Sequence, residues 1–369
     1  MLPETAGVVL IGTHPWTNST FDRLMPRAVL PIADRPLVSY ALSWLRQGGV
    51  RELAVCGNRE TRLVQNQLLE CLPPGARVSY HEDPMPRGAA GSVRDAVAAS
   101  NANTFVVADG TAIPTMVDLA DLLAQHRASG AAVTIVVHTG PRQDDNPGVQ
   151  EPTGIYVFER RALDRVPERG FCDIKEKLIP ELYRIGERIE IFETRHPVPR
   201  VFGLSTYLAA HDWTVEYFTR LTDAPEGFVR SGTALVHRTA IVSPDAMLVG
   251  PVIVGAGATI KSGAIVVGPS SIGRDAIVDS GAVVSRSALW QDCSVGDHAV
   301  ADRCVVAAES VIEPRTQAIQ AIMNTRRVRV NVVQEAPALD LSDLPMLEFG
   351  RRVGRLLIGA DWSRSPAAR

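Results

Sequence analysis

The chain has 369 residues, of which 46% are hydrophobic and 21% are charged, and its formal net charge is -3. A chain of this length can bury a large core and is expected to form two domains or a little more. The charge balance leaves no basic excess to neutralise a phosphate backbone, which argues against nucleic acid as a partner.

The first part of the chain alternates strand-like and helix-like segments. Strands are expected at residues 8–11, 53–56, 78–80, 105–108 and 132–137, and helices at residues 36–47, 60–72, 91–99 and 116–128. This alternation predicts an α/β, Rossmann-like domain with a mixed, mostly parallel sheet and helices on both faces. A ligand crevice is expected at the carboxyl ends of the strands.

From Val236 onward, aliphatic residues recur every six positions. The pattern runs in register to Val284, and a small or apolar residue follows each aliphatic residue four positions later. Hexapeptide repetition predicts a β-helix, in which each aliphatic side chain stacks on its equivalent in the next coil. The phase slips near Trp290, where a bulge or a partner-facing irregularity is expected. The repeat resembles the left-handed parallel β-helix of the hexapeptide-transferase superfamily.

We expect three regions in the chain. They are a nucleotidyltransferase-like α/β domain at residues 1–230, the β-helix at residues 231–314 and a C-terminal extension at residues 315–369. The extension contains an alternating segment typical of an edge strand, a helix capped by Ser342 and a disordered tail. The helix is expected to dock on its own β-helix or on a second subunit, and a membrane-surface helix is the weaker alternative.

The cysteines form no close pair and no Cys/His cluster with metal-ligand spacing, so neither a disulfide framework nor a structural zinc site is expected. They are Cys56, Cys71, Cys172, Cys293 and Cys304. No signal peptide and no apolar stretch of about 18 residues is recognisable, which predicts a cytoplasmic protein without a membrane span.

Several segments occur in the order and spacing of a known enzyme family. They read MPRAVLPIADRPLVSYALSWLRQGGV, HEDPMPRGAAGSVRDA, FVVADGTAI, TGIYVFERRAL and DIKEKLIPELYRIGERI, and the hexapeptides follow. Over roughly residues 6–313 the chain resembles the nucleoside-diphosphate-sugar pyrophosphorylases, especially the mannose-1-phosphate guanylyltransferase branch. The resemblance implies a reaction that joins a sugar 1-phosphate to a nucleotide and releases pyrophosphate, within nucleotide-sugar metabolism and polysaccharide biosynthesis.

The phosphate-binding loop departs from that family. Its pattern Leu-Ala-Gly-Gly-x-Gly-Thr-Arg aligns without a gap, and the second and third glycines correspond to Thr13 and Pro15 and the arginine to Thr17. Gly12 and a cation at the family's Pro-Lys position, Arg27, remain. A glycine-rich loop binds phosphate through close backbone amides, and proline has no amide hydrogen to donate.

The two carboxylates that hold magnesium in the family are also replaced. One position is Thr111, in a Gly-Asp pair that here reads Gly110-Thr111, and the other is Gly203, in a segment that aligns with Trp-x-Asp-Ile-Gly-Thr. A hard dication needs anionic oxygen ligands. Asp109 lies about 6.6 Å from Thr111 if the strand continues at its usual rise, which is too far to take the same coordination position unaided.

The sugar-phosphate and base segments differ in how much remains. Between residues 137 and 153 the family inserts tens of residues with a Glu-Lys-Pro that contacts the sugar phosphate, and this segment is missing here. Residues 86–95 keep the glycines and small residues that let the family's backbone read the base, although a turn capping the next helix would need them too. The candidate nucleotide-binding residues are Gly12, Thr13, Arg27, Gly88, Ala89, Ala90, Gly91, Asp109 and Gly110.

Three functions follow as hypotheses. The first is a degenerate relative that binds a nucleotide sugar or nucleotide, or nothing, and serves as a regulatory or scaffolding subunit. The second is an active pyrophosphorylase with magnesium as cofactor, in which Asp109 with Glu82 or Asp83 holds the metal and Arg27 the phosphate.

The third hypothesis is acyl transfer on the β-helix, with His237 or His298 as general base. In all three cases a homo-oligomer or hetero-complex through residues 236–330 is expected, because a β-helix end exposes stacked aliphatic side chains and strand edges.

Overall fold

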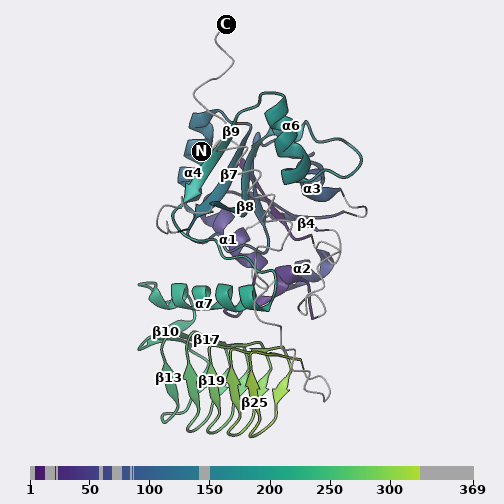
Figure 1. Ribbon diagram of the computed structural model, residues 1–369. Coiled ribbons are helices and arrows are strands. Elements are labelled where there is room, and N and C mark those ends of the chain that lie inside the picture. Colours follow the sequence, from purple (N-terminus) through teal and green to yellow (C-terminus); the bar gives the residue numbers. More distant parts are fainter. Residues whose placement is uncertain are drawn as a thin grey trace, which may run out of the picture.

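The computed structural model describes residues 5–12, 21, 24–57, 61–68, 77–83, 85, 87–140 and 150–324. Figure 1 shows an α/β unit at one end, a stack of short strands at the other and helix α7 (Leu204–Arg220) between them. The expected helix and edge strand of the C-terminal extension lie outside the described residues.

The α/β unit is built on a seven-stranded sheet with the order β5-β4-β1-β6-β8-β7-β9. The strands are β1 (Thr5–Leu10), β4 (Glu52–Gly57), β5 (Arg77–Glu82), β6 (Thr104–Asp109), β7 (Val133–Thr139), β8 (Gln150–Glu159) and β9 (Ile189–Thr194). Only β8 is antiparallel to its neighbours β6 and β7. Near-continuous apolar runs in β1, β4, β6 and β7 suit strands that are buried on both faces. The predicted mixed, mostly parallel sheet is confirmed.

Helices cover both faces of this sheet. The helical segments before α7 are η2 (Arg27–Val29), α1 (Val38–Gln47), α2 (Thr61–Leu68), α3 (Gly88–Ala96), α4 (Leu119–Ser129), α5 (Arg160–Leu163), η3 (Ile174–Leu178) and α6 (Ile179–Arg184). Helices α1, α2 and α4 share one apolar cluster with the sheet, and α3, α5 and α6 share the other. Helix α3 starts three residues earlier than expected, and α4 starts at residue 119 because Asp118 caps it by accepting from the amides of Ala120 and Asp121.

A hairpin of β2 (Pro31–Ile32) and β3 (Arg35–Pro36) follows η2.

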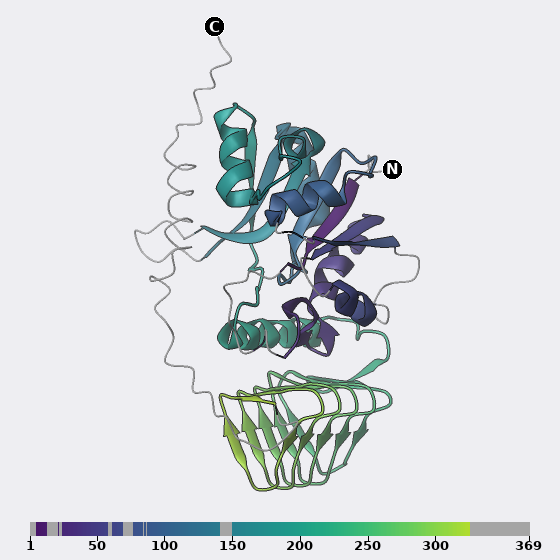
Figure 2. The same ribbon diagram turned by 90° about the vertical axis from the view of Figure 1, so that its right-hand side faces the viewer.

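The second unit is the predicted β-helix, formed by three stacks of short strands that pair in parallel from coil to coil (Figure 2). The first stack contains β10 (Phe228–Ser231), which is antiparallel to its neighbour, then β11 (Ala234–His237), β14 (Val252–Val254), β17 (Ser270–Ile272), β20 (Ala288–Leu289), β23 (Val305–Val306) and β26 (Ile322–Met323). The second contains β12 (Ile241–Val242), β15 (Thr259–Ile260), β18 (Ile277–Val278), β21 (Ser294–Val295) and β24 (Val311–Ile312). The third contains β13 (Met247–Val249), β16 (Ile265–Val267), β19 (Val283–Ser285), β22 (Val300–Asp302) and β25 (Gln317–Ile319). Most of the aliphatic residues of the hexapeptides are fully buried inside the coils.

The slip in the repeat has a different form from the one expected. Val266 pairs with Val284, 18 residues later, whereas Val284 pairs with Ala301, 17 residues later. The missing residue falls at the corner between β19 and β20, and the strand pairing continues without a bulge. Trp290 is not an exposed irregularity, because only 2% of it is accessible and it packs under α7.

Helix α7 joins the two units through buried polar contacts. The Tyr207 hydroxyl donates to the carbonyl of Pro31 and accepts from the Trp290 indole nitrogen at 2.9 Å. On the next turn of the helix, His211 Nε2 lies 2.8 Å from the Ser271 hydroxyl of β17. Buried polar groups are expensive to leave unpaired, so these bonds fix how α7 sits between sheet and β-helix.

Candidate functional site

The candidate site lies where β1 and β6 end side by side. Leu10 pairs with Asp109 at the last position of the two strands, and the Gly110 amide donates to the Leu10 carbonyl at 2.7 Å. A Cβ on Gly110 would lie 3.0 Å from that carbonyl, so any larger residue would have to push the two strand ends slightly apart. The exposed Gly12 lies two residues after the end of β1, whereas Thr13, Pro15 and Thr17 lie outside the described residues.

Asp109 is the carboxylate of this site, and its oxygens already have donors. Oδ1 accepts from the Thr111 amide at 2.9 Å and from the Thr111 hydroxyl at 2.8 Å, and Oδ2 accepts from the Arg200 guanidinium. Burial by itself would raise the pKa of Asp109, but Arg200 and the Thr111 hydrogen bonds outweigh it and lower that pKa. The Asp109 carboxyl group is therefore deprotonated at neutral pH and already paired.

The expected separation of about 6.6 Å between Asp109 and Thr111 assumed a strand that continues. The structure differs, because β6 ends at Asp109 and the chain turns so that Thr111 folds back onto the carboxylate. The same turn brings in Arg200, since the segment of Pro199 to Val201 pairs with residues 111–113.

Thr111 and Gly203, the two positions that the resemblance assigns to magnesium ligands, carry no carboxylate. Thr111 donates to Asp109, and Gly203 is the N-cap of α7, where its amide donates to the Thr206 hydroxyl at 2.9 Å. Within the described residues, no group of three or more His, Cys, Asp or Glu side chains could hold a metal ion. A dication about 4 Å from the Arg200 guanidinium would meet a repulsion on the order of 8 kcal/mol at an effective dielectric of about 20. The described residues around Asp109 therefore do not fit magnesium.

Two other carboxylates that could replace the lost ligands lie elsewhere. Glu82 and Asp83 are at the end of β5, which β4 and β1 separate from β6. The ends of β5 and β6 are therefore three strand spacings apart, which corresponds to about 14 Å. Asp83 is also engaged, because it accepts from the Arg87 amide and the Ser92 hydroxyl. The structure does not bring these residues together with Asp109.

Residues 88–91, the candidate base-reading segment, begin α3 and contact the chain's own backbone. The Cys172 carbonyl accepts from the amides of Ala90 at 3.0 Å and Gly91 at 3.3 Å. Gly88 has a φ of +73°, and a Cβ there would lie 2.5 Å from the same carbonyl. These contacts require the glycine for folding, whether or not Ala89 and its neighbours also meet a base.

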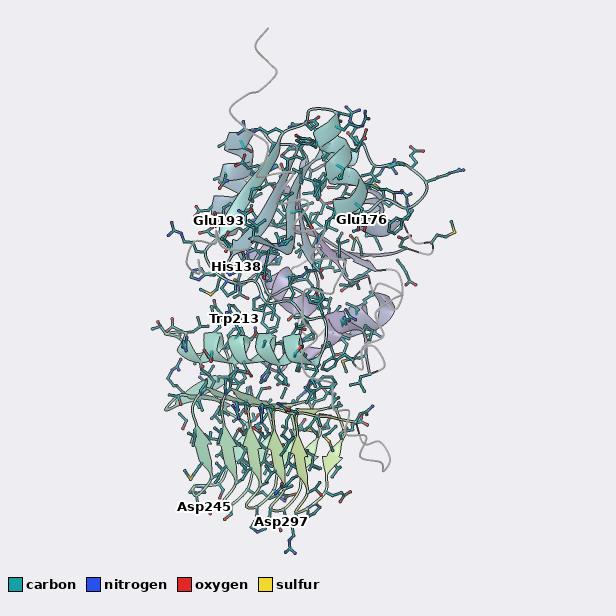
Figure 3. All side chains as sticks on the ribbon, in the orientation of Figure 1. His138, Glu176, Glu193, Trp213, Asp245 and Asp297 are labelled. Carbon is teal, nitrogen blue, oxygen red and sulfur yellow. The ribbon has the colours of Figure 1, made fainter. Side chains whose placement is uncertain are left out.

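The remaining sequence candidates are placed as follows. Arg27 lies at the start of η2 with only 8% of the residue accessible. His237 Nδ1 is 2.8 Å from the Thr239 hydroxyl. His298 is exposed at a turn with a φ of +51°, next to Asp297, which Figure 3 places at the edge of the β-helix far from α7.

Arg200 and Lys175 belong to the site although the sequence did not single them out. Lys175 follows the helix cap Asp173, and burial followed by the nearby Arg200 lowers the pKa of its ammonium group. The available signal was an arginine directly before the segment that aligns with the second metal ligand. Without a fold, nothing assigned that arginine to Asp109.

In the part of the chain that the structure describes, no helix is long and apolar enough to cross a membrane.

Comparison with known proteins agrees with this architecture. Residues 18–188 match the family of MobA-like NTP transferase domains. The chain is 26% identical over 287 residues to the mannose-1-phosphate guanylyltransferase of Mycobacterium tuberculosis. This alignment covers 69% of this chain and 76% of the relative. It is 26% identical over 198 residues to the UTP--glucose-1-phosphate uridylyltransferase of Synechocystis. This alignment covers 44% of this chain and 51% of the relative.

A third relative is the probable mannose-1-phosphate guanylyltransferase 1 of Oryza sativa subsp. japonica. It is 24% identical over 279 residues, which cover 66% of this chain and 74% of the relative. Together with the α/β fold and the β-helix, these similarities support a nucleotide-sugar pyrophosphorylase-like family for this chain.

Proposed function

We propose that this chain is a catalytically degenerate member of its family that binds a nucleotide sugar or nucleotide and acts as a regulatory or scaffolding subunit. The observation that carries the proposal is the state of Asp109. Its carboxylate is occupied by Arg200 and Thr111, and the positions of the two metal ligands hold Thr111 and Gly203. Transfer of a nucleotidyl group requires the charge of the departing pyrophosphate to be offset.

The size of the expected defect follows from how many groups are changed. Removal of one preorganised donor for developing charge typically lowers the rate by about 10²- to 10³-fold. Here both metal carboxylates, a loop arginine and a loop amide are replaced at once. Even with strong non-additivity, little activity should remain.

The test is exchange of labelled pyrophosphate into GDP-mannose, dTDP-glucose and UDP-glucose in the presence of magnesium. An active mannose-1-phosphate guanylyltransferase assayed in parallel is the positive control. We expect exchange at the level of the buffer blank with every nucleotide sugar. Robust exchange with any of them would instead establish an active pyrophosphorylase.

A scaffolding role also needs a surface for a partner, and the β-helix offers one. Exposed aliphatic side chains lie on the two stacks that α7 does not cover, including Ile241 at 66%, Met247 at 54% and Ile319 at 51% accessible. Apolar surface of this kind favours association with a second copy or a related chain. Size-exclusion chromatography with light scattering should give an oligomer, and a clean monomer at all concentrations would count against self-association.

A further inference from the structure

The site around Asp109 contains two positively charged side chains, Arg200 and Lys175. Arg200 is fixed in front of β6 by its own backbone, since it bridges to Ala112 and the Ile113 amide donates to the Pro199 carbonyl at 2.9 Å. Lys175 lies on the first turn after its cap Asp173, close enough to interact electrostatically with both Arg200 and Asp109.

The Arg200 guanidinium is held closely on several sides. It pairs with Asp109, and its central carbon lies 4.7 Å from the centre of the Phe202 ring. Its Nε is buried and has no hydrogen-bond partner among the described residues. Gly154 closes another side, because a Cβ there would lie 3.3 Å from the guanidinium carbon and 3.0 Å from the Cβ of Asp109. A φ of +82° at Gly154 adds to the need for glycine.

Lys175 differs from the other charged groups of the site in having no close counter-ion. Within the described residues, no carboxylate oxygen lies within 4 Å of its ammonium nitrogen, and Asp173 uses Oδ1 to cap the amides of Lys175 and Glu176. The side chain is partly buried beside a second cation, an arrangement that costs free energy unless an anion pairs with it. A ligand phosphate at the end of β6 would supply that anion.

We infer that Arg200 and Lys175 replace the magnesium ion and that the diphosphate of a nucleotide sugar binds this chain without a metal. The inference rests on the proposed function, because it concerns the ligand of the same site. Arginine suits the role, since its planar donors match phosphate oxygens and it stays charged at all relevant pH values. Lysine adds a point charge.

The experiment is calorimetric titration of the full chain with GDP-mannose, dTDP-glucose and UDP-glucose, in EDTA and in magnesium. For the sugar that binds, we expect dissociation constants within about twofold of each other in the two buffers. Lys175→Gln should weaken binding about tenfold and Arg200→Gln at least as much, as expected for loss of one charge-assisted hydrogen bond. Lys177→Gln, whose ammonium instead donates to the Phe171 carbonyl, is the matched control and should bind normally.

Each other outcome overturns the inference in a distinguishable way. Binding that requires magnesium but comes without pyrophosphate exchange would refute the replacement of the metal and leave the degenerate function standing. Binding with exchange would refute both proposals. If no nucleotide sugar binds in EDTA or in magnesium, the inference is refuted and only the scaffolding role is left. Unchanged affinity of a folded Lys175→Gln protein would show that Lys175 does not contact the ligand.

A gain-of-metal variant gives a second readout. The variant Arg200→Gln/Thr111→Asp/Gly203→Asp removes the cation that pairs with Asp109 and places carboxylates at the two positions that the resemblance assigns to metal ligands. Gly203 has an extended backbone, and no atom lies within 4 Å of an added Cβ, so aspartate fits there. We expect binding to become magnesium-dependent, and retention of metal-independent binding at the original affinity would contradict the inference.

Discussion

Replacement of Arg200 by glutamine is the most informative single change to the stability of the site. It removes the cation that faces Asp109, while the two side chains are only 17% and 28% accessible. Breaking a fully buried ion pair typically costs about 3–5 kcal/mol. Because part of each group reaches water and Thr111 still donates to the carboxylate, we expect a loss of about 2 kcal/mol at pH 7, or roughly 4–8 °C in Tm.

The loss should depend on pH in a defined direction. In the native protein, burial alone would raise the pKa of Asp109, yet Arg200 and Thr111 hold it below its usual value. Asp109 therefore contributes stability above its unfolded pKa and loses that contribution as the pH falls through the lowered folded value. Without Arg200, burial prevails, the carboxyl takes up a proton on mild acidification and the penalty for an unpaired anion disappears. The difference between the two proteins should shrink from pH 7 to about pH 4.

The assay is urea unfolding of both proteins across this pH range. Arg184→Gln is the control, because its ion pair with Glu181 lies on the surface, where the two side chains are 71% and 44% accessible. That variant should match the native protein at every pH, since exposed ion pairs contribute little. An Arg200→Gln protein no less stable than this control, or a loss that stays the same on acidification, would refute the reasoning.

Three further predictions concern the surrounding structure. Gly88→Ala should destabilise the protein by about 2 kcal/mol or more because of its positive φ and the carbonyl 2.5 Å away, whereas Gly130→Ala, with a φ of +64° and open space, should cost about 1 kcal/mol in thermal unfolding. Tyr207→Phe should lower the unfolding free energy by about 1–3 kcal/mol, because the Trp290 indole and a backbone carbonyl lose their partner. Burial raises the pKa of Cys56 to about 12, so mass spectrometry should find this thiol unmodified by iodoacetamide in the native protein at pH 8 and labelled after denaturation.

The architecture could be predicted because its signals are periodic and local. Continuous apolar runs specify strands buried on both faces, and the hexapeptides specify which side chains point into the β-helix. The period does not specify which outward row is covered. Leu235 and Ile253 are 1% and 4% accessible under α7, whereas Ile241 and Ile277, equally outward and equally apolar, are 66% and 37% accessible. Only the packing of α7 against one of the two rows separates them, and the hexapeptide pattern does not contain that information.

For the candidate site too, the sequence predicts features that depend on local spacing but not contacts between distant segments. The assignment of the family's two acidic positions to Thr111 and Gly203 rests on the spacing of the resembling segments and stays a prediction. The compensating cation could not be predicted, because Arg200 meets Asp109 across 91 residues of chain through a turn after β6 that the sequence did not reveal. A continued strand was assumed there, and it would have kept Thr111 away from the carboxylate.

The account depends on Arg200, and no divalent cation, facing Asp109 when nucleotide is bound. The most direct measurement is a crystal structure of the full chain with a bound nucleotide sugar and manganese, using the anomalous signal of the metal. We predict no anomalous peak beside Asp109 and an unbroken pair with Arg200. A peak within coordination distance of Asp109, with Arg200 turned away, would contradict the account.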